Sequence, residues 1–422
     1  MASVSSKKDR SFAARPGSTL AVLTGLNALN YLDRFLVAPL LPLIIADFGL
    51  SYRAAGSLQS AFILVYAIAC PGAGWLGDRY PRLRMAALGV VLWSLATVAS
   101  GIVMTFAGLL LARALVGIGE ASYTVITPSV LSDHYPAHRR ARALSIFYAA
   151  MPFGIAIGYA LGGQIGAHYG WRPAFFVAGG PGIVLACTLL FLREPARGRL
   201  DAGAQTAPRI TPMRDFFHLL KHRPSYFVNM AAQTLYTFTM GGLGAWMPTY
   251  FVRERHLGVA QAGTLFGGLL LAAGFVGTLL GGWMGDRLAT KHRGAHFTFS
   301  AVTLLASLPF TVLAVTSDRP WIYWSSMGAT LFFLFLNYGP LNAALINVLP
   351  SHARARGVGL HTTTIHVFGD ACSPFLIGAA SDAIGLRIPV LSSGLLVAAS
   401  AALLLAGRRA FVKDLAAAST GA

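Results

Sequence analysis

Four charged side chains lie inside stretches of this sequence that are otherwise apolar. Asp33 and Arg34 are adjacent, and Arg113 and Glu120 are seven residues apart. Seven residues make almost two turns of an α-helix, so Arg113 and Glu120 would share one face about 10 Å apart along the axis. A carboxylate removed from water holds its proton more firmly, whereas a nearby arginine favours the charged form. This competition is what a reversible proton carrier needs. The alternative is an ion-pair network that only joins two helices.

A second titratable pair falls in the second half of the chain. His366 and Asp370 are one helical turn apart on one face. They form either a second proton site or a pair in which each side chain only provides the hydrogen-bond partner of the other. Other polar groups in apolar stretches are Asn229, Gln233, Tyr236, Asn337, Asn342 and His361. We take Gln233, Tyr236, Asn337, His366 and Asp370 as candidate substrate contacts.

The composition places these residues in a membrane protein. Of 422 residues, 55% are hydrophobic and 11% are charged, whereas a soluble domain carries about 25% charged residues. This composition excludes a soluble enzyme, a disordered chain and a secreted disulfide scaffold. The three cysteines, Cys70, Cys187 and Cys372, are expected to be buried free thiols. The sequence contains no metal-ligand spacing and no ATP-binding loop, so we expect no cofactor.

Apolar runs between charged or turn-rich breaks predict an all-α membrane protein with twelve transmembrane helices in two six-helix halves. The expected cores in the first half are 18–46, 54–76, 84–104, 106–132, 140–166 and 172–193. Those in the second half are 225–251, 260–284, 294–315, 320–347, 355–381 and 386–407. The chain is therefore divided into an N-terminal tail (1–17), a first half (18–193), a central loop (194–224), a second half (225–407) and a C-terminal tail (408–422).

The positions of lysine and arginine predict the orientation, because positively charged loops stay in the cytoplasm. With the N-terminus inside, the inner segments hold 25 of these residues and the outer loops hold 6. Both termini are therefore expected in the cytoplasm. Topology and anionic lipid then account for the net charge of +18 without a nucleic acid partner. No cleavable signal peptide is visible, and the absence of an Asn-x-Ser/Thr sequon favours a bacterial inner membrane.

The two halves repeat each other. Gly74-Trp-Leu-Gly-Asp78-Arg79 follows the second expected helix, and Gly282-Trp-Met-Gly-Asp286-Arg287 follows the eighth, at an offset of 208 residues. A second pair of related segments, 136–142 and 350–356, has an offset of 214 residues. Two related offsets at corresponding helix ends indicate a duplicated six-helix unit, a recurring design of transporters with the binding site between the halves.

The two GxxGDR segments resemble the loop signature of the major facilitator superfamily, and the resemblance covers essentially the whole chain. An aspartate at a helix end can accept hydrogen bonds from the free N–H groups of a neighbouring helix start. The resemblance implies that this cluster latches the cytoplasmic side shut when the cavity opens outward, and Arg142 is expected to pair with Asp78. The expected gating residues are Gly74, Asp78, Arg79, Arg142, Asp286 and Arg287.

Further motifs narrow the resemblance to the spinster branch of this superfamily. These are Asn30-Tyr31-Leu-Asp33-Arg34, the segment from Arg113 through Gly-Glu120-Ala-Ser-Tyr, and the segment from Arg142 through Tyr148. Spinster proteins move lysophospholipids and sphingoid phosphates, and this transport is coupled to protons. The resemblance therefore implies that Asp33 and Glu120 are the protonation pair. It also implies that Arg34 and Arg113 are the cations on the substrate side, with Tyr31 and Tyr148 as further substrate contacts.

We therefore predict a proton-coupled secondary active transporter of anionic amphiphiles that works by alternating access as a monomer and draws its energy from a proton gradient. The alternatives are a proton-coupled symporter of small organic anions such as sugar acids, a multidrug-type exporter, and a channel or receptor without coupled turnover. Glycines at every fourth position from Gly154 to Gly166 resemble an antiporter signature, but Tyr159 stands where that signature has proline. We interpret these glycines as a surface for tight helix packing.

Overall fold

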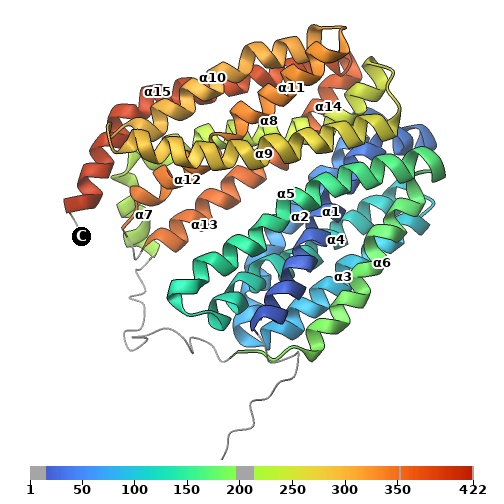
Figure 1. Cartoon of the computed structure of the whole chain (residues 1–422), viewed down its shortest axis with the longest axis horizontal. Coiled ribbons are helices and arrows are strands. Elements are labelled where there is room, and N and C mark those ends of the chain that lie inside the picture. The colour runs from blue at the N-terminus through green and yellow to red at the C-terminus, as the bar shows by residue number, and fades with distance from the viewer. Residues whose placement is uncertain (1–15, 196–212, 351–352, 421–422) are drawn as a thin grey trace, which may run out of the picture.

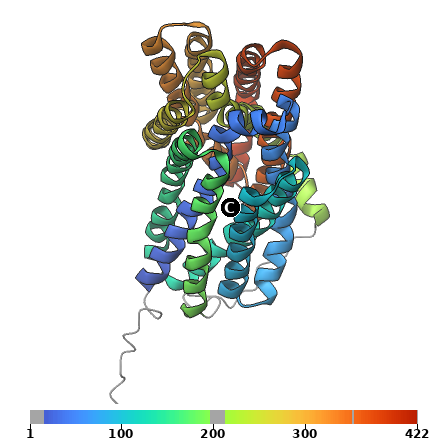
Figure 2. The ribbon, with the colours of Figure 1, turned by 90° about the vertical axis from the view of Figure 1, so that its right-hand side faces the viewer.

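The computed structural model describes residues 16–195, 213–350 and 353–420, and this part of the chain is helical along most of its length without a β-strand. The first half contains α1 (Pro16–Phe48), α2 (Tyr52–Arg79), α3 (Arg82–Ile102), α4 (Phe106–His134), α5 (Ala137–Tyr169) and α6 (Trp171–Phe191). The second half contains α8 (Pro224–Glu254), α9 (Val259–Ala289), α10 (Ala295–Thr316), α11 (Pro320–Phe335), α12 (Tyr338–Asn347), α13 (Arg354–Ile365), η3 (His366–Asp370), α14 (Ser373–Ile384) and α15 (Arg387–Thr420). The halves form two adjacent bundles (Figures 1 and 2).

The described residues contain the twelve predicted spans. Ten of these spans are long and apolar enough to cross a membrane, with α11 and α12 counted as one. The more polar α8 and the interrupted series α13–η3–α14 supply the other two. The all-α fold of two six-helix halves is therefore confirmed.

The ends of the predicted segments differ from the structure in two places. A short helix, α7 (Met213–Lys221), occupies part of the predicted central loop, and α15 continues through most of the predicted C-terminal tail. The rest of that loop and most of the N-terminal tail lie outside the described residues, as do positions 351 and 352 of the second repeat. The three cysteines are free thiols as expected, but the expectation that they are buried is wrong: Cys187 is exposed, and Cys70 and Cys372 are partly exposed.

Two spans of the second half are interrupted at polar residues, which the sequence did not predict. Between α11 and α12, the Asn337 amide nitrogen donates hydrogen bonds to the backbone carbonyls of Phe333 and Leu334, at 2.9 and 3.3 Å. Pro340, which has no N–H group to donate, then occupies the first turn of α12. At η3 the Ala371 N–H bonds to the His366 carbonyl five residues back, which widens the helix by one residue.

Glycines allow the helices of each half to approach closely. A Cβ atom at Gly158 of α5 would lie 2.5 Å from the Leu32 carbonyl oxygen of α1, and one at Gly162 would lie 2.7 Å from that of Leu36. Atoms do not approach this closely in packed proteins, so any side chain here would push the helices apart. The prediction of tight packing along this face of α5 is confirmed.

The two halves contact each other at one end of the molecule. The end at which α1 begins and α15 finishes is here called the terminal end, and the opposite one the closed end. At the closed end, the Gln164 amide of α5 donates to Thr264 of α9 over 3.1 Å. The N–H groups of Tyr52 and Arg53, at the start of α2, donate to the Asp382 carboxylate of α14 over 2.6 and 3.0 Å. Toward the terminal end α5 and α9 diverge (Figure 1).

Candidate functional site

A cavity of about 640 Å³ lies between the two halves, on the terminal side of the closed-end contacts. Its walls come from α1, α2, α4 and α5 of the first half and from α8, α12, α13 and η3 of the second. The lining is mostly apolar, and its polar side chains include Tyr31, Arg34, Gln59, Tyr66, Tyr338, Thr362, His366 and Asp370. The size suits a drug-sized ligand or part of a lipid, since such sites usually span about 300–1,000 Å³.

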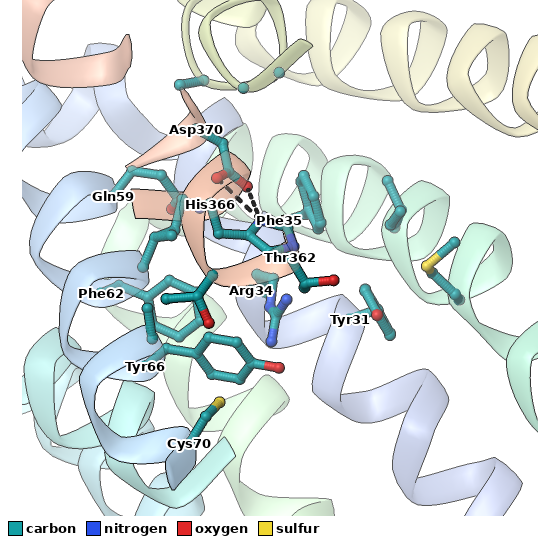
Figure 3. Close-up of a pocket in the computed structure, with 18 of the residues that line it drawn as sticks. Tyr31, Arg34, Phe35, Gln59, Phe62, Tyr66, Cys70, Thr362, His366 and Asp370 are labelled. Atoms are coloured by element: carbon teal, nitrogen blue, oxygen red, sulfur yellow. Dashed lines mark hydrogen bonds and ion pairs between the residues drawn. The ribbon is translucent and has the colours of Figure 1, made fainter. Parts of the chain in front are cut away.

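Arg34 of α1 connects the cavity to the buried carboxylate of Glu120. Its guanidinium donates to Glu120 Oε2 from Nε at 3.1 Å and from Nη2 at 2.7 Å. The Arg34 side chain is 15% exposed, whereas that of Glu120 is not exposed at all. Three rings surround the guanidinium, with centroids 5.1 Å (Tyr31), 5.2 Å (Phe62) and 4.7 Å (Tyr66) from its central carbon (Figure 3). Arg34 is therefore a cation that an anion in the cavity can reach.

Asp33 and Arg113 form a second ion pair deeper in the same half. The Arg113 guanidinium lies 3.3 Å from Asp33 Oδ1, and the side chains are 0% and 1% exposed. The Thr97 hydroxyl of α3 donates to the other Asp33 oxygen. The central carbon of Arg113 lies 4.9 Å from the Phe62 ring, which also contacts Arg34. The adjacent residues Asp33 and Arg34 thus join α1 to α4 through two ion pairs that share one aromatic ring.

Several polar atoms of this cluster have no hydrogen-bond partner among the described residues. They are Glu120 Oε1, Arg113 Nε and Nη2, and both amide atoms of Asn30. Buried polar groups are normally paired, so a group of unpaired atoms is unusual and often marks a functional site. The free Oε1 atom can accept a proton while Oε2 keeps its contact with Arg34.

His366 and Asp370 lie on η3, in the second half's wall of the cavity. His366 Nδ1 is 3.0 Å from both carboxylate oxygens of Asp370. Both residues line the cavity, and in the close-up they lie above the Arg34 guanidinium (Figure 3). The wider helical turn of η3 therefore places a titratable pair in the cavity with the cation of the first half.

The other predicted substrate contacts lie outside the cavity lining in this conformation. Gln233 donates to Asn229, and the Tyr236 hydroxyl donates to the Leu334 carbonyl. Asn337 is fully buried at the α11–α12 junction, and Arg113 is enclosed behind Arg34. Tyr148 is 48% exposed and packs against the neighbouring ring of Phe147. Their role as direct ligands stays a prediction.

Phe62, Tyr66 and Thr97 belong to the cluster but were missed by the sequence reasoning. Gln59, Phe62, Tyr66 and Cys70 recur at intervals of three or four residues, which places them on one face of α2. That periodicity was the available signal, but it equally describes ordinary helix packing. Nothing in the sequence around Thr97 distinguishes it from the other small polar residues of α3.

The repeated loop residues lie at the terminal ends of α2 and α9. The Arg79 guanidinium lies 5.5 Å from the Trp75 ring, and that of Arg287 also lies 5.5 Å from the Trp283 ring. The equal geometry supports the duplication. Gly74 lies beside Trp75 near the end of α2, and Asp286 lies beside Arg287 near the end of α9. The pairing of Asp78 with Arg142 stays a prediction.

The structure adds a third repeated feature. Gly170 joins α5 to α6 at φ +82°, and Gly385 joins α14 to α15 at φ +75°. Residues with a side chain rarely adopt this backbone conformation, so both turns favour glycine. An arginine follows each glycine by two positions. The two halves therefore share the same turn at their fifth-to-sixth span connections.

Comparison with known proteins agrees with this arrangement. The family model described as the Major Facilitator Superfamily matches residues 23–369. Protein spinster homolog 1 of Xenopus tropicalis is 34% identical over 385 residues, covering 86% of this chain and 72% of its own. The sphingosine-1-phosphate transporter SPNS2 of Mus musculus is 34% identical, covering 86% of this chain and 69% of its own.

The chain belongs to the spinster group of the major facilitator superfamily. It is therefore a transporter rather than an enzyme. Among solved structures, a bacterial homolog of the human lysosomal transporter spinster in an inward-facing, unoccupied conformation superposes with a TM-score of 0.86. That match has 22% identity and covers 94% of this chain and 98% of the other. A D-xylose–proton symporter has the same fold, with a TM-score of 0.71 at 15% identity, covering 91% of this chain and 96% of its own.

Proposed function

We propose that this transporter carries an anionic amphiphile, such as a lysophospholipid or sphingoid phosphate, and couples its movement to protons. The observation that carries the proposal is the position of Arg34. Its guanidinium reaches the cavity on one side and holds the buried Glu120 carboxylate on the other. A phosphate group suits this position, because a guanidinium binds phosphate through two parallel hydrogen bonds.

Substrate binding and protonation are linked through this shared cation. A phosphate that binds Arg34 competes with Glu120 for the same N–H groups. When Glu120 loses its counter-ion in a site without exposure to water, its neutral form becomes favoured. Protonation of Glu120 in turn releases Arg34 for the phosphate, because linkage between two sites is reciprocal. Asp33 is the second proton site of this cycle, and its contacts with Arg113 and the Thr97 hydroxyl favour the charged form against the effect of burial.

The walls of the cavity support a substrate with a hydrocarbon chain. Phe35, Ile63, Met151, Ile155 and Val358 provide apolar surface beside the Arg34 side chain. A small, fully hydrophilic anion would leave this surface in contact with water, whereas an acyl or sphingoid chain would cover it. The name of the mouse relative specifies sphingosine-1-phosphate, which combines a phosphate with such a chain.

The proposed cycle is rocking of the two halves about the cavity. The closed-end contacts join the halves in the present conformation, and the terminal end is the open one. We place the terminal end in the cytoplasm, because the lysines and arginines concentrate there, and we place the transporter in a bacterial inner membrane as a monomer. The open conformation is then inward-facing, and the gating residues at the ends of α2 and α9 act in the opposite state.

Transport by purified protein in liposomes tests this proposal. A panel of lysolipids should be compared with sugar acids, with and without a pH gradient. We expect lysolipid uptake that saturates and depends on the gradient. Glu120→Gln and Asp33→Asn should bind substrate but fail to concentrate it. Accumulation of sugar acids alone would favour the small-anion symporter, and normal accumulation by both variants would exclude the assigned proton sites.

A further inference from the structure

A groove separate from the central cavity lies near the terminal end of the second half. It has a volume of about 240 Å³ and is formed where α9, α10 and α15 meet. Both α10 and α15 lie on the side of this half that faces away from the first half (Figure 1). Nearby apolar side chains on these helices are exposed, among them Val302 (57%) and Leu405 (45%). Such side chains on a membrane protein face lipid, so the groove opens toward the bilayer.

The groove has a cationic end and an apolar end. Arg408 and His292 lie at its terminal end, and Leu288, Phe299 and Val302 form its walls. The guanidinium of Arg408 lies directly over Gly294, where a Cβ atom would come within 2.8 Å of Nε. No hydrogen bond or ion pair within the described part of the chain involves the Arg408 side chain. The glycine thus creates the space in which an unpaired guanidinium lies across the groove.

The surroundings are strongly positive. Cations at the end of α9, on the α9–α10 connection and on α15 include Arg287, Lys291, Arg293, Arg409 and Lys413, and Asp286 is the acid beside them on α9. The carboxylate of Asp414 is buried and accepts hydrogen bonds from Ser225, at 2.9 Å from the backbone N–H and 2.6 Å from the hydroxyl. It therefore does not neutralise the groove.

We propose that this groove binds an anionic phospholipid of the bilayer, with its phosphate on Arg408 and His292 and one acyl chain along Phe299 and Val302. The order of the two ends matches the order of a lipid in the membrane, with the head group toward the terminal end and the chain toward the centre. Basic pockets between membrane-spanning helices favour anionic head groups. The site does not depend on the cargo or on proton coupling.

Native mass spectrometry of the purified, delipidated protein tests the site, with dioleoylphosphatidylglycerol and dioleoylphosphatidylcholine as probes. We expect retention of phosphatidylglycerol in preference to phosphatidylcholine. Arg408→Gln should weaken phosphatidylglycerol binding about fivefold, the effect expected for one interfacial cation. Arg319→Gln removes the same charge from an exposed side chain at the closed end and should change nothing. Val302→Trp should also reduce retention, because the indole fills the apolar part of the groove.

Four outcomes would overturn the proposal. One is equal retention of both lipids by the native chain. Another is unchanged phosphatidylglycerol binding by both Arg408→Gln and Val302→Trp, each of which changes an exposed side chain and should fold normally. The third is loss of binding in Arg34→Gln but not in Arg408→Gln, which would place the lipid in the central cavity. Competition by glycerol 1-phosphate as strong as that by the lipid would also contradict a site that needs the acyl chain.

Discussion

At the scale of single residues, Arg34 is the point where substrate chemistry and proton chemistry meet. Its guanidinium donates two hydrogen bonds to Glu120 Oε2 and lies among three aromatic rings. Removing one member of a buried ion pair leaves the other charge uncompensated, which costs about 3–5 kcal/mol. Conservative substitutions are therefore more informative here than truncations.

Arg34→Lys keeps the charge but loses the forked geometry of the guanidinium. We expect the KM for lysolipid uptake to rise roughly tenfold, because one lost hydrogen bond to a charged group is worth about 1.5 kcal/mol. Uptake kinetics in liposomes measure this change. Arg319→Lys, at an exposed position, serves as the matched control. An unchanged KM would mean that Arg34 acts only as a structural partner of Glu120.

Thr97 is the residue that supports the charged form of Asp33. Thr97→Val keeps the volume of the side chain and removes its hydroxyl donor. We expect a loss of about 1.5–3 kcal/mol in the free energy of unfolding at neutral pH, the usual value for a hydrogen bond to a charged group. This loss should shrink when the pH is lowered enough to protonate Asp33. The exposed Thr316→Val is the control, and equal effects of the two substitutions would argue against this role.

The sequence revealed the charged residues of the site but only part of their surroundings. Asp33, Arg34, Arg113 and Glu120 were identifiable because charges in apolar stretches are rare. Their pairing, Arg34 with Glu120 and Asp33 with Arg113, depends on how α1 and α4 are rotated against each other. Phe62, Tyr66 and Thr97 were not identifiable, because aromatic and small polar residues are common in helix interfaces.

At the scale of elements, glycines determine how closely α1 and α5 pack. Gly158→Ala would place a methyl group 2.5 Å from the Leu32 carbonyl oxygen. We expect a destabilisation of about 1–3 kcal/mol, the usual cost of overpacking. Gly180→Ala is the matched control, because its Cβ atom would meet nothing within 4 Å. Thermal unfolding in detergent compares the two variants, and equal melting temperatures would contradict the packing argument.

The contact between α2 and α14 belongs to the present conformation. Asp382 accepts hydrogen bonds from the first turn of α2, where an anion is also favoured by the helix dipole. Asp382→Ala removes both bonds, so we expect fewer molecules closed at this end. Spin labels at positions 145 and 346, on α5 and α12, should then give a larger fraction of short distances across the terminal end.

In the same distance measurement, Asp78→Asn should shift the conformations in the opposite direction to Asp382→Ala. If Asp78 latches the terminal end in the other state, its substitution should increase the fraction of long distances between the same labels. Identical distance distributions for the native protein and Asp382→Ala would mean that these hydrogen bonds do not hold the closed end. The labels require a background in which Cys70, Cys187 and Cys372 are replaced by serine.

Helix positions followed from the sequence more completely than helix interruptions did. The twelve spans are marked by long apolar runs, which only helices satisfy inside a bilayer. The break at Asn337 and the wider turn at η3 are not marked in this way, because polar residues near them do not specify which backbone hydrogen bonds are exchanged. Local exchanges of one backbone hydrogen bond for another determine these features. The prediction that His366 and Asp370 share a face survived the wider turn, since their side chains remain in contact.

At the scale of the whole molecule, the duplication places one polar wall from each half around a single cavity. The first half provides Arg34 and the buried ion pairs, and the second provides His366 and Asp370. The duplication was visible in the sequence as the repeated GxxGDR segments. The asymmetry was visible as well, because the charged residues of the first half and the His366–Asp370 pair fall in spans that do not correspond.

Proton uptake by the purified protein on addition of a lysolipid decides whether substrate binding and protonation of Glu120 are linked through Arg34. A pH-sensitive dye in weakly buffered detergent solution reports it. We expect the native protein to take up protons on binding, because the phosphate displaces Glu120 from Arg34, and we expect Glu120→Gln to bind the lipid without proton uptake. Equal proton uptake by the native protein and Glu120→Gln, or none by the native protein, would contradict this linkage.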